Sequence, residues 1–79
     1  MKSRKTKTWT LEDLEEIYGN TTANNLWLNA PYVANAFKEG WGSDAYGEVV
    51  ARYGFSHDEE IEKLFCDLVN QIRPGTINI

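Results

Sequence analysis

The sequence predicts an all-α fold: a small single-domain bundle of four to five short helices, joined by turns that end in glycine. Three observations predict it. Apolar residues recur at intervals of three and four, capping residues precede these segments, and a glycine follows most of them. The alternation of polar and apolar residues that marks a β-strand is not sustained anywhere before residue 76. With only 79 residues, the chain is expected to form one core of thin stability.

The first helix is expected over residues 11–18. Thr10 is a good N-cap, and Asp13 and the acids after it suit the positive end of a helix dipole. The apolar residues of the segment share one helical face: Leu11, Leu14, Ile17 and Tyr18. Gly19 is expected to end the helix in a left-handed conformation.

The next segment is ambiguous. Asn20 or Thr21 is suited to cap a short helix that reaches Leu28, but four asparagines between residues 20 and 30 weaken this prediction, because asparagine prefers caps and turns. Pro31 suits the first position of a separate helix over residues 31–39. That helix has an apolar face and is ended by a glycine: Tyr32, Val33, Ala36, Phe37 and then Gly40.

A third apolar stripe follows a turn in which Ser43 is the predicted N-cap. Its members are Ala45, Tyr46, Val49, Val50 and Tyr53. Gly54 is expected to end this helix. Gly47 lies inside it and costs up to about 1 kcal/mol relative to alanine, which suggests that another backbone approaches closely there.

The last helix is predicted over residues 57–72. Ser56 and Glu59 have the spacing of a capping box, in which each side chain accepts a hydrogen bond from the other residue's backbone. The predicted core stripe is Ile61, Leu64, Phe65, Leu68 and Ile72. Pro74 and Gly75 break the helix, and residues 76–79 are equally compatible with a short strand, a packed tail or disorder.

Charge divides the chain into a basic arm (residues 1–8), an acidic helical domain (residues 9–75) and a C-terminal tail (residues 76–79). Residues 1–7 carry four basic side chains: Lys2, Arg4, Lys5 and Lys7. The remaining four basic and twelve acidic side chains give −8, and with the +4 of the arm this makes the −4 of the whole chain. An acidic body repels nucleic acid and attracts basic partners.

The sequence offers no catalytic constellation, so an enzyme is not expected, and neither a cofactor nor a metal site is expected. His57 and the acids after it are explained by the predicted capping box. Cys66, the only cysteine, lies nine residues after His57 on the predicted helix, too far for a Cys–His pair. The single cysteine fits a reducing compartment, and the basic start is followed by no apolar run. We therefore expect a cytoplasmic protein with no membrane contact.

The candidate partner-binding residues are two clusters of carboxylates and one tryptophan on a turn. A carboxylate array can imitate a phosphate backbone and occupy a basic groove, and a tryptophan on a turn can anchor an interface. The candidates are Glu12, Glu15 and Glu16 in the first helix, Trp41 in the turn, and Asp58, Glu59, Glu60 and Glu62 in the last helix. Ordinary solvated helix faces and caps explain the same carboxylates without a partner. A tryptophan on a turn of so small a protein more often folds back over the core than anchors an interface.

These features predict a small acidic protein-interaction module that blocks a basic, nucleic-acid-binding surface of a protein. By analogy of size and charge alone, such a module suits an inhibitor encoded by a phage or mobile element, of which anti-CRISPR proteins are examples. Homodimerisation is a natural companion, because the aromatic residues are numerous for one small core. The alternative is a helix-turn-helix regulator that binds DNA with its basic arm. The helices over 31–39 and 57–72 lack the basic or amide-rich face that DNA recognition needs.

Overall fold

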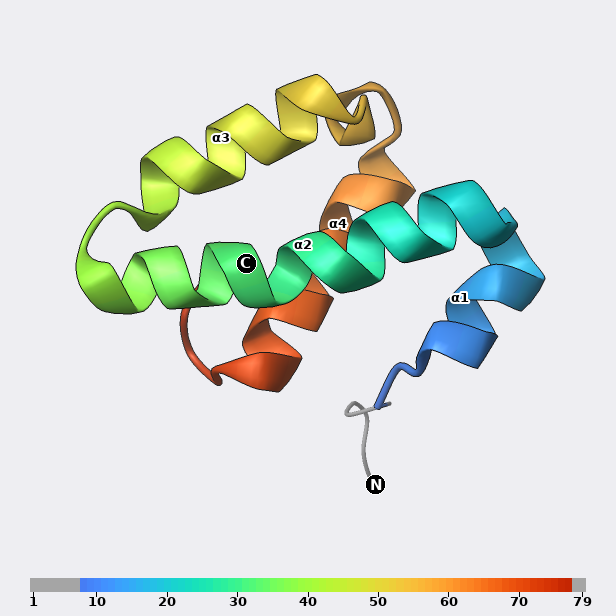
Figure 1. The fold of residues 1–79 in the computed structure, drawn as a ribbon, viewed down its shortest axis with the longest axis horizontal. Coiled ribbons are helices and arrows are strands. Elements are labelled where there is room, and N and C mark those ends of the chain that lie inside the picture. Colours follow the sequence, from blue (N-terminus) through green and yellow to red (C-terminus); the bar gives the residue numbers. More distant parts are fainter. Residues whose placement is uncertain (1–7, 78–79) are drawn as a thin grey trace.

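The computed structural model describes residues 8–77 and confirms the all-α prediction for them (Figure 1). It contains α1 (Leu11–Tyr18), α2 (Asn20–Glu39), α3 (Gly42–Arg52), a 3₁₀ turn η1 (Phe55–His57) and α4 (Glu59–Ile72). The predicted basic arm, apart from Thr8, and the last two residues of the predicted tail lie outside the described residues.

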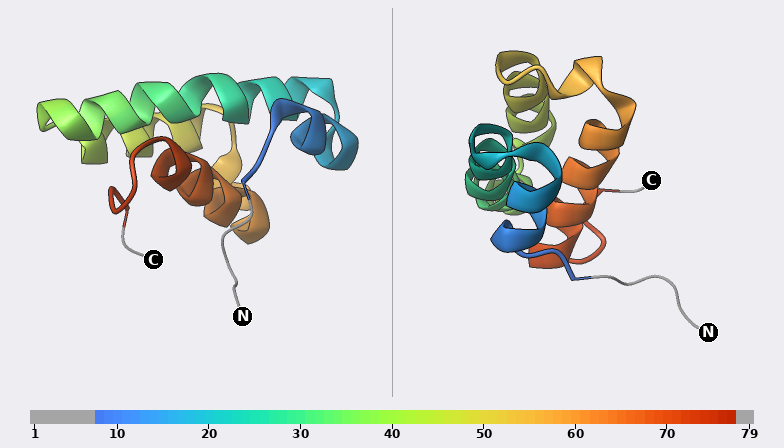
Figure 2. Two further views of the ribbon diagram at one scale, coloured as in Figure 1. Left: turned by 90° about the horizontal axis from the view of Figure 1, so that it is seen from below. Right: turned by 90° about the vertical axis from the view of Figure 1, so that its right-hand side faces the viewer.

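The long helix α2 organises the fold, because it contacts each of the other three α-helices. α3 runs back along α2 in the opposite direction, and α4 crosses behind it (Figure 1). In the left view of Figure 2, α2 spans the top of the molecule, and α1 and α4 lie beneath it. The core therefore lies where α2 meets the other helices, and its largest fully buried side chains are Phe65, Leu14, Leu26, Leu68, Val33 and Val69.

The predicted break at Pro31 is wrong, since Asn20–Glu39 is one continuous helix with Pro31 inside it. Pro31 is exposed, and as a proline it cannot donate the helical hydrogen bond to the carbonyl of Trp27. The helix nevertheless buries one uninterrupted apolar stripe that holds both halves against the core: Ala23, Leu26, Ala30, Val33, Ala34 and Ala36. Packing of this stripe outweighs the local cost of proline and asparagine.

Two capping predictions are wrong. Asp58, not Ser56, is the N-cap of α4, and its carboxylate accepts hydrogen bonds from the backbone N–H groups of Glu60 and Ile61 at 3.0 and 3.3 Å. Ser56 lies in the 3₁₀ turn before it. Ser43 is not an N-cap either, because α3 already begins at Gly42.

The capping box of this chain occurs at α1. The backbone N–H of Asp13 donates to the Thr10 hydroxyl, the backbone N–H of Thr10 donates to the Asp13 carboxylate, and both distances are 3.2 Å. The expectation for Thr10 as N-cap is confirmed, and Gly19 ends α1 with a positive φ of 86°.

The close approach predicted at Gly47 is found at Gly42 instead. A Cβ on Gly47 would meet no atom within 4 Å, whereas a Cβ on Gly42 would overlap the ring of Phe37. Gly42 is buried at the start of α3, where the chain turns back from α2. The absence of a side chain at Gly42 therefore sets how closely α3 approaches α2.

The predicted apolar stripes are confirmed at their centres and wrong at their edges. Leu64, Phe65 and Leu68 are buried as predicted, as are Val33, Ala36, Ala45, Val49 and Val50. The exposed members are Ile17 (56%), Ile72 (50%), Tyr32 (41%) and Tyr53 (37%). A stripe wider than the contact it faces leaves its outer residues in solvent, and these four residues become surface features.

Two amide side chains at the end of α4 hold the chain segments that flank the bundle. The Gln71 amide accepts from the backbone N–H of Trp9 at 2.6 Å and donates to the Trp9 carbonyl at 2.9 Å. Asn70 makes the same pair of bonds with Ile77, both at 2.7 Å. Of the three alternatives for the tail, the packed one holds as far as Ile77, which packs against the core.

Candidate functional site

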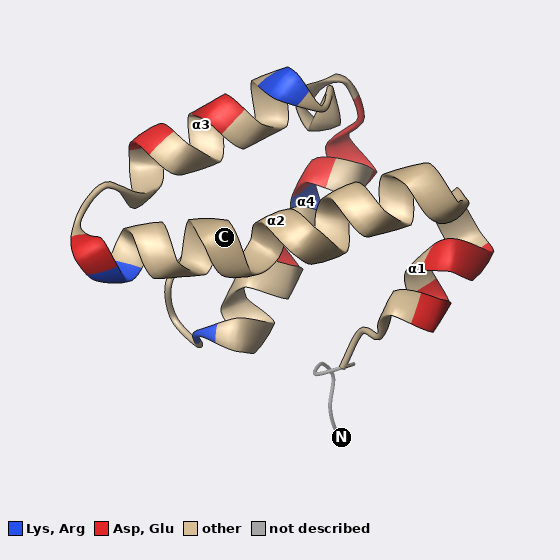
Figure 3. Cartoon of the chain, viewed as in Figure 1, with Lys and Arg blue, Asp and Glu red and all other residues tan. Residues whose placement is uncertain are grey.

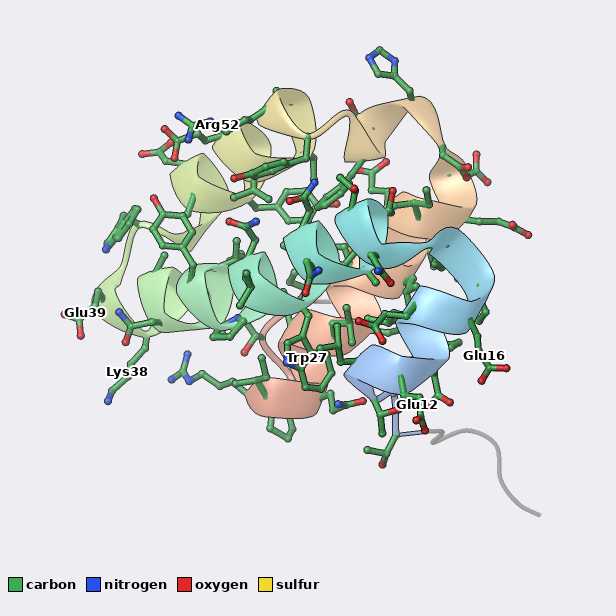
Figure 4. All side chains as sticks on the ribbon, turned by 45° about the vertical axis from the view of Figure 1, so that its right-hand side comes forward. Glu12, Glu16, Trp27, Lys38, Glu39 and Arg52 are labelled. Carbon is green, nitrogen blue, oxygen red and sulfur yellow. The ribbon has the colours of Figure 1, made fainter. Side chains whose placement is uncertain are left out.

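The first acidic cluster lies on α1 and points away from the core. Leu14 is completely buried against α2, so the residues on the opposite side of this short helix face solvent. Glu12 and Glu16 are exposed one turn apart and project outward in Figure 4, while Glu15 is half-buried. Asp13 is engaged in the capping box.

The second acidic cluster begins α4, and its members differ in their roles. Asp58 caps the helix, so part of its charge has a structural purpose. Glu59 and Glu60 are exposed, and their side chains make no hydrogen bond or ion pair with residues 8–77. Glu62 is half-buried and accepts a hydrogen bond from the Tyr46 hydroxyl at 2.8 Å. Glu62 is thus committed to an internal contact with α3.

The two clusters come from segments that lie more than forty residues apart in the sequence. Burial, followed by the charges of Glu60 and Asp58, raises the pKa of Tyr18 above its ordinary value. Figure 3 shows both clusters in the right-hand half of the molecule.

We call this region the acidic surface and define it by six of the candidate residues: Glu12, Glu15, Glu16, Asp58, Glu59 and Glu60. Ile17 is the most exposed large apolar residue of α1, with 56% of its surface accessible, and it adjoins Glu16 in the chain. The acidic surface therefore includes an apolar side chain, which sequence reasoning assigned to the core.

Trp41 is not part of the acidic surface. It lies in the turn between α2 and α3, at the end of the molecule opposite α1 (Figure 1). Its ring is 42% exposed and meets Tyr32 edge to face, with 5.6 Å between the ring centroids. Trp41 therefore cannot supply the apolar anchor for the two acidic clusters.

Tyr32, the ring partner of Trp41, lines a second feature, a hollow of about 230 Å³ between α2 and α3. The hydroxyl of Tyr32 donates to Glu48 at 3.2 Å across this hollow. Its lining is polar and aromatic: Asn29, Tyr32, Glu48, Val49, Arg52 and Tyr53. Sequence reasoning missed Tyr32 and Tyr53 because both stand at the edge of an apolar stripe, where the period alone does not separate core from surface.

Cys66 lies in a polar contact but is poorly suited to nucleophilic chemistry. Its Sγ atom is 3.4 Å from the Tyr46 hydroxyl, and the residue is buried. Burial raises the pKa of the Cys66 thiol, and the Tyr46 hydrogen bond opposes this only in part. A neutral thiol is a weak nucleophile. His57 is exposed on η1, outside α4.

Within residues 8–77, no group of three or more His, Cys, Asp or Glu side chains is arranged to hold a metal ion. No helix in this part of the chain is both long enough and apolar enough to cross a membrane. No protein-family model matches the chain, no curated protein is similar to it, and no solved structure matches it.

Proposed function

We propose that this protein is a non-enzymatic interaction module whose acidic surface binds and blocks a basic, nucleic-acid-binding surface of another protein. The observation that carries the proposal is that exposed carboxylates of α1 and of the first turn of α4, supplied by two distant segments, lie in the same half of the molecule in Figure 3. Residues 8–77 hold all twelve acidic side chains of the chain and only four of its eight basic ones.

The charge of this surface explains attraction, and Ile17 supplies an apolar contact. Carboxylates fixed on rigid helices present several charges to an Arg/Lys groove at constant spacing, which speeds association and selects for basic partners. Charge alone rarely gives tight binding, because interfaces depend on a few buried apolar contacts. Ile17 is exposed beside Glu16 and is suited to this role.

The DNA-binding alternative gains no support from the arrangement of α1 and α2. In the first turns of α2 the amide of Asn20 is exposed, those of Asn24 and Asn25 are half-buried, and α2 has no basic residue before Lys38. The preceding helix α1 carries four carboxylates, and these would repel the phosphate backbone of a duplex docked nearby. A role for the basic arm as a secondary contact to an acidic edge of the same protein partner remains part of the proposal.

A charge-reversal series tests the proposal. One variant combines Glu12→Lys with Glu16→Lys, and a second combines Glu59→Lys with Glu60→Lys. The matched control, Glu39→Lys with Asp44→Lys, changes the net charge equally at the other end of the fold, where Figure 4 shows Glu39. Far-UV circular dichroism first establishes that all three variants fold.

Each tagged variant is then used to capture proteins from a bacterial lysate at low and at high salt. We expect the parent and the control to retain the same protein partner at low salt, and both acidic-surface variants to lose it. The partner should also dissociate at high salt. Equal retention by all variants at both salt concentrations would show that the acidic surface is not the binding surface, and tight capture of duplex DNA instead of protein would favour the alternative.

A further inference from the structure

A second surface lies between α2 and the end of α4, the helix whose first turn contributes to the acidic surface. Two adjoining hollows, of about 210 and 220 Å³, share Pro31 and Ile72 and together form what we call the α2–α4 groove. The first hollow is almost entirely apolar and is lined by Trp27, Ala30, Pro31, Leu68, Gln71 and Ile72. Each hollow has room for about one large side chain.

The walls of the first hollow have little need of polar partners. The Gln71 amide already exchanges two hydrogen bonds with the backbone of Trp9. Ile72, the last residue of α4, is half-exposed, and the chain after it is held by Asn70 through the backbone of Ile77. An apolar side chain entering the hollow would displace water without leaving a buried polar group unpaired.

The second hollow differs from the rest of the domain in charge. Lys38 and Arg73 line it together with Ala34 and Asn35, and no carboxylate belongs to its lining. These are two of the four basic residues after residue 7, in a domain of net charge −8. Trp27 and Lys38 project from the same lower edge of α2 in Figure 4, so the apolar and basic parts follow one another along the helix.

This order of features determines which occupant fits. The chain's own arm carries Lys2, Arg4, Lys5 and Lys7, and like charges would oppose its contact with Lys38 and Arg73. A segment that presents a large apolar side chain followed by a carboxylate would match both halves of the groove. Such a segment would meet an electrostatic attraction here that the rest of this acidic domain does not provide.

We propose that the α2–α4 groove binds a segment of a partner protein in which a large apolar side chain is followed by Asp or Glu. The apolar side chain lies between Trp27 and Ile72, and the carboxylate lies against Lys38 and Arg73. The groove is a binding surface separate from the acidic surface, and it selects the opposite charge.

Panning a library of random dodecamer peptides against the immobilised full-length protein tests this. Counter-selection uses the double variant Lys38→Glu/Arg73→Glu. We expect enriched peptides to share a large apolar residue followed by Asp or Glu. Their affinity for the double variant should fall by about tenfold or more, since the variant replaces attraction by repulsion. Amide chemical-shift changes on binding should map to residues 27–38 and 68–73.

Matched controls separate the groove from general charge and apolarity. Arg52→Glu/Lys63→Glu makes the same charge change outside the groove and should leave peptide binding unchanged. Ile72→Ser should weaken binding, whereas Leu28→Ser, which removes an even more exposed apolar side chain, should not. Basic consensus peptides, equal binding to the Lys38→Glu/Arg73→Glu variant, or no enrichment would overturn the proposal, as would a concentration-dependent dimer that Ile72→Ser abolishes, because the occupant would then be a second copy.

Discussion

Gly42 and Gly47 lie five residues apart in α3, and the same substitution is expected to act in opposite directions at the two positions. A methyl group on Gly42 would overlap the ring of Phe37, whereas a methyl group on Gly47 would meet no atom within 4 Å. Neither glycine has a positive φ, so backbone strain does not complicate the comparison. The space around each glycine therefore decides whether alanine raises or lowers the free energy of unfolding.

The overlap at Gly42 involves the base of the Phe37 ring, not its far edge, because the nearest atom is Cγ. The ring cannot escape by a small rotation, so either α3 moves away from α2 or Phe37 turns out of its partly buried position. Overpacking of this kind costs about 1–3 kcal/mol. At Gly47, which is exposed within a helix, alanine should stabilise the fold by about 0.8–1 kcal/mol.

Urea denaturation followed by circular dichroism measures the change in the free energy of unfolding for both variants. In thermal denaturation, a domain of this size shifts its melting temperature by about 4–8 °C per kcal/mol. Gly42→Ala should melt below the parent and Gly47→Ala above it. In a Phe37→Ala background, Gly42→Ala should lose its cost, because the ring that it strikes is gone. A Gly42→Ala variant as stable as the parent would refute the close packing of Phe37 over Gly42.

Three other predictions concern the core, the cap and alkaline stability. Phe65→Ala should cost about 3–5 kcal/mol and leave little folded protein at 37 °C by circular dichroism, because Phe65 is fully buried against Phe55. Asp58→Ala should cost about 1 kcal/mol in urea titrations and Ser56→Ala almost nothing, since only Asp58 caps α4; equal effects would contradict this assignment. Burial, aided by hydrogen bonds, raises the pKa of the Tyr46 hydroxyl in the folded state above its ordinary value of 10.0. The protonated hydroxyl therefore contributes to the free energy of unfolding below pH 10, and this contribution is lost as the pH rises further. Tyr46→Phe should therefore lose less stability than the parent between neutral pH and pH 11, and parallel losses would argue against a buried Tyr46 hydroxyl.

Local sequence signals predicted helix in each of the four segments that form α-helices. They did not predict that the piece ending at Leu28 and the piece over residues 31–39 join into one helix. Pro31 indicated a helix start because a proline at that position costs least there. The decisive information lay in the spacing of the small residues on either side of it, which continue one buried face from Ala23 to Ala36. That face is stabilised as one continuous helix surface only because α1, α3 and α4 pack against it, and these tertiary contacts cannot be read from the local sequence.

The cap of α4 shows a different limit. Ser56 and Asp58 are both good N-caps, and the Ser56–Glu59 spacing favoured the earlier position. The chain leaves Gly54 in a left-handed conformation and continues into a 3₁₀ turn that buries Phe55 between the rings of Tyr53 and Phe65. Burial of this aromatic ring delays the start of the α-helix by two residues, an effect that no capping rule contains.

The candidate site was predicted in composition but not in arrangement. The carboxylates of α1 and α4 were recognisable from the sequence, but their relative placement depends on how both helices pack beneath α2. Trp41 was singled out as a candidate interface anchor; its side chain is 42% exposed, but the fold places it at the far end from α1. The α2–α4 groove was not predictable, because it is formed by Pro31 and Ile72, two residues that the sequence assigned to a helix start and a core stripe.

The position of α4 determines how the two proposed surfaces relate. Its first turn contributes Glu59 and Glu60 to the acidic surface, and its last turn contributes Ile72 to the groove. A helix of 14 residues is about 20 Å long, so a partner segment in the groove need not cover Glu59 and Glu60. Because Phe65 fixes the middle of α4 in the core, binding at one end is not expected to move the other. Charge reversal at Glu59 and Glu60 should therefore leave peptide binding in the groove unchanged, whereas loss of both activities would mean that the two surfaces act as one.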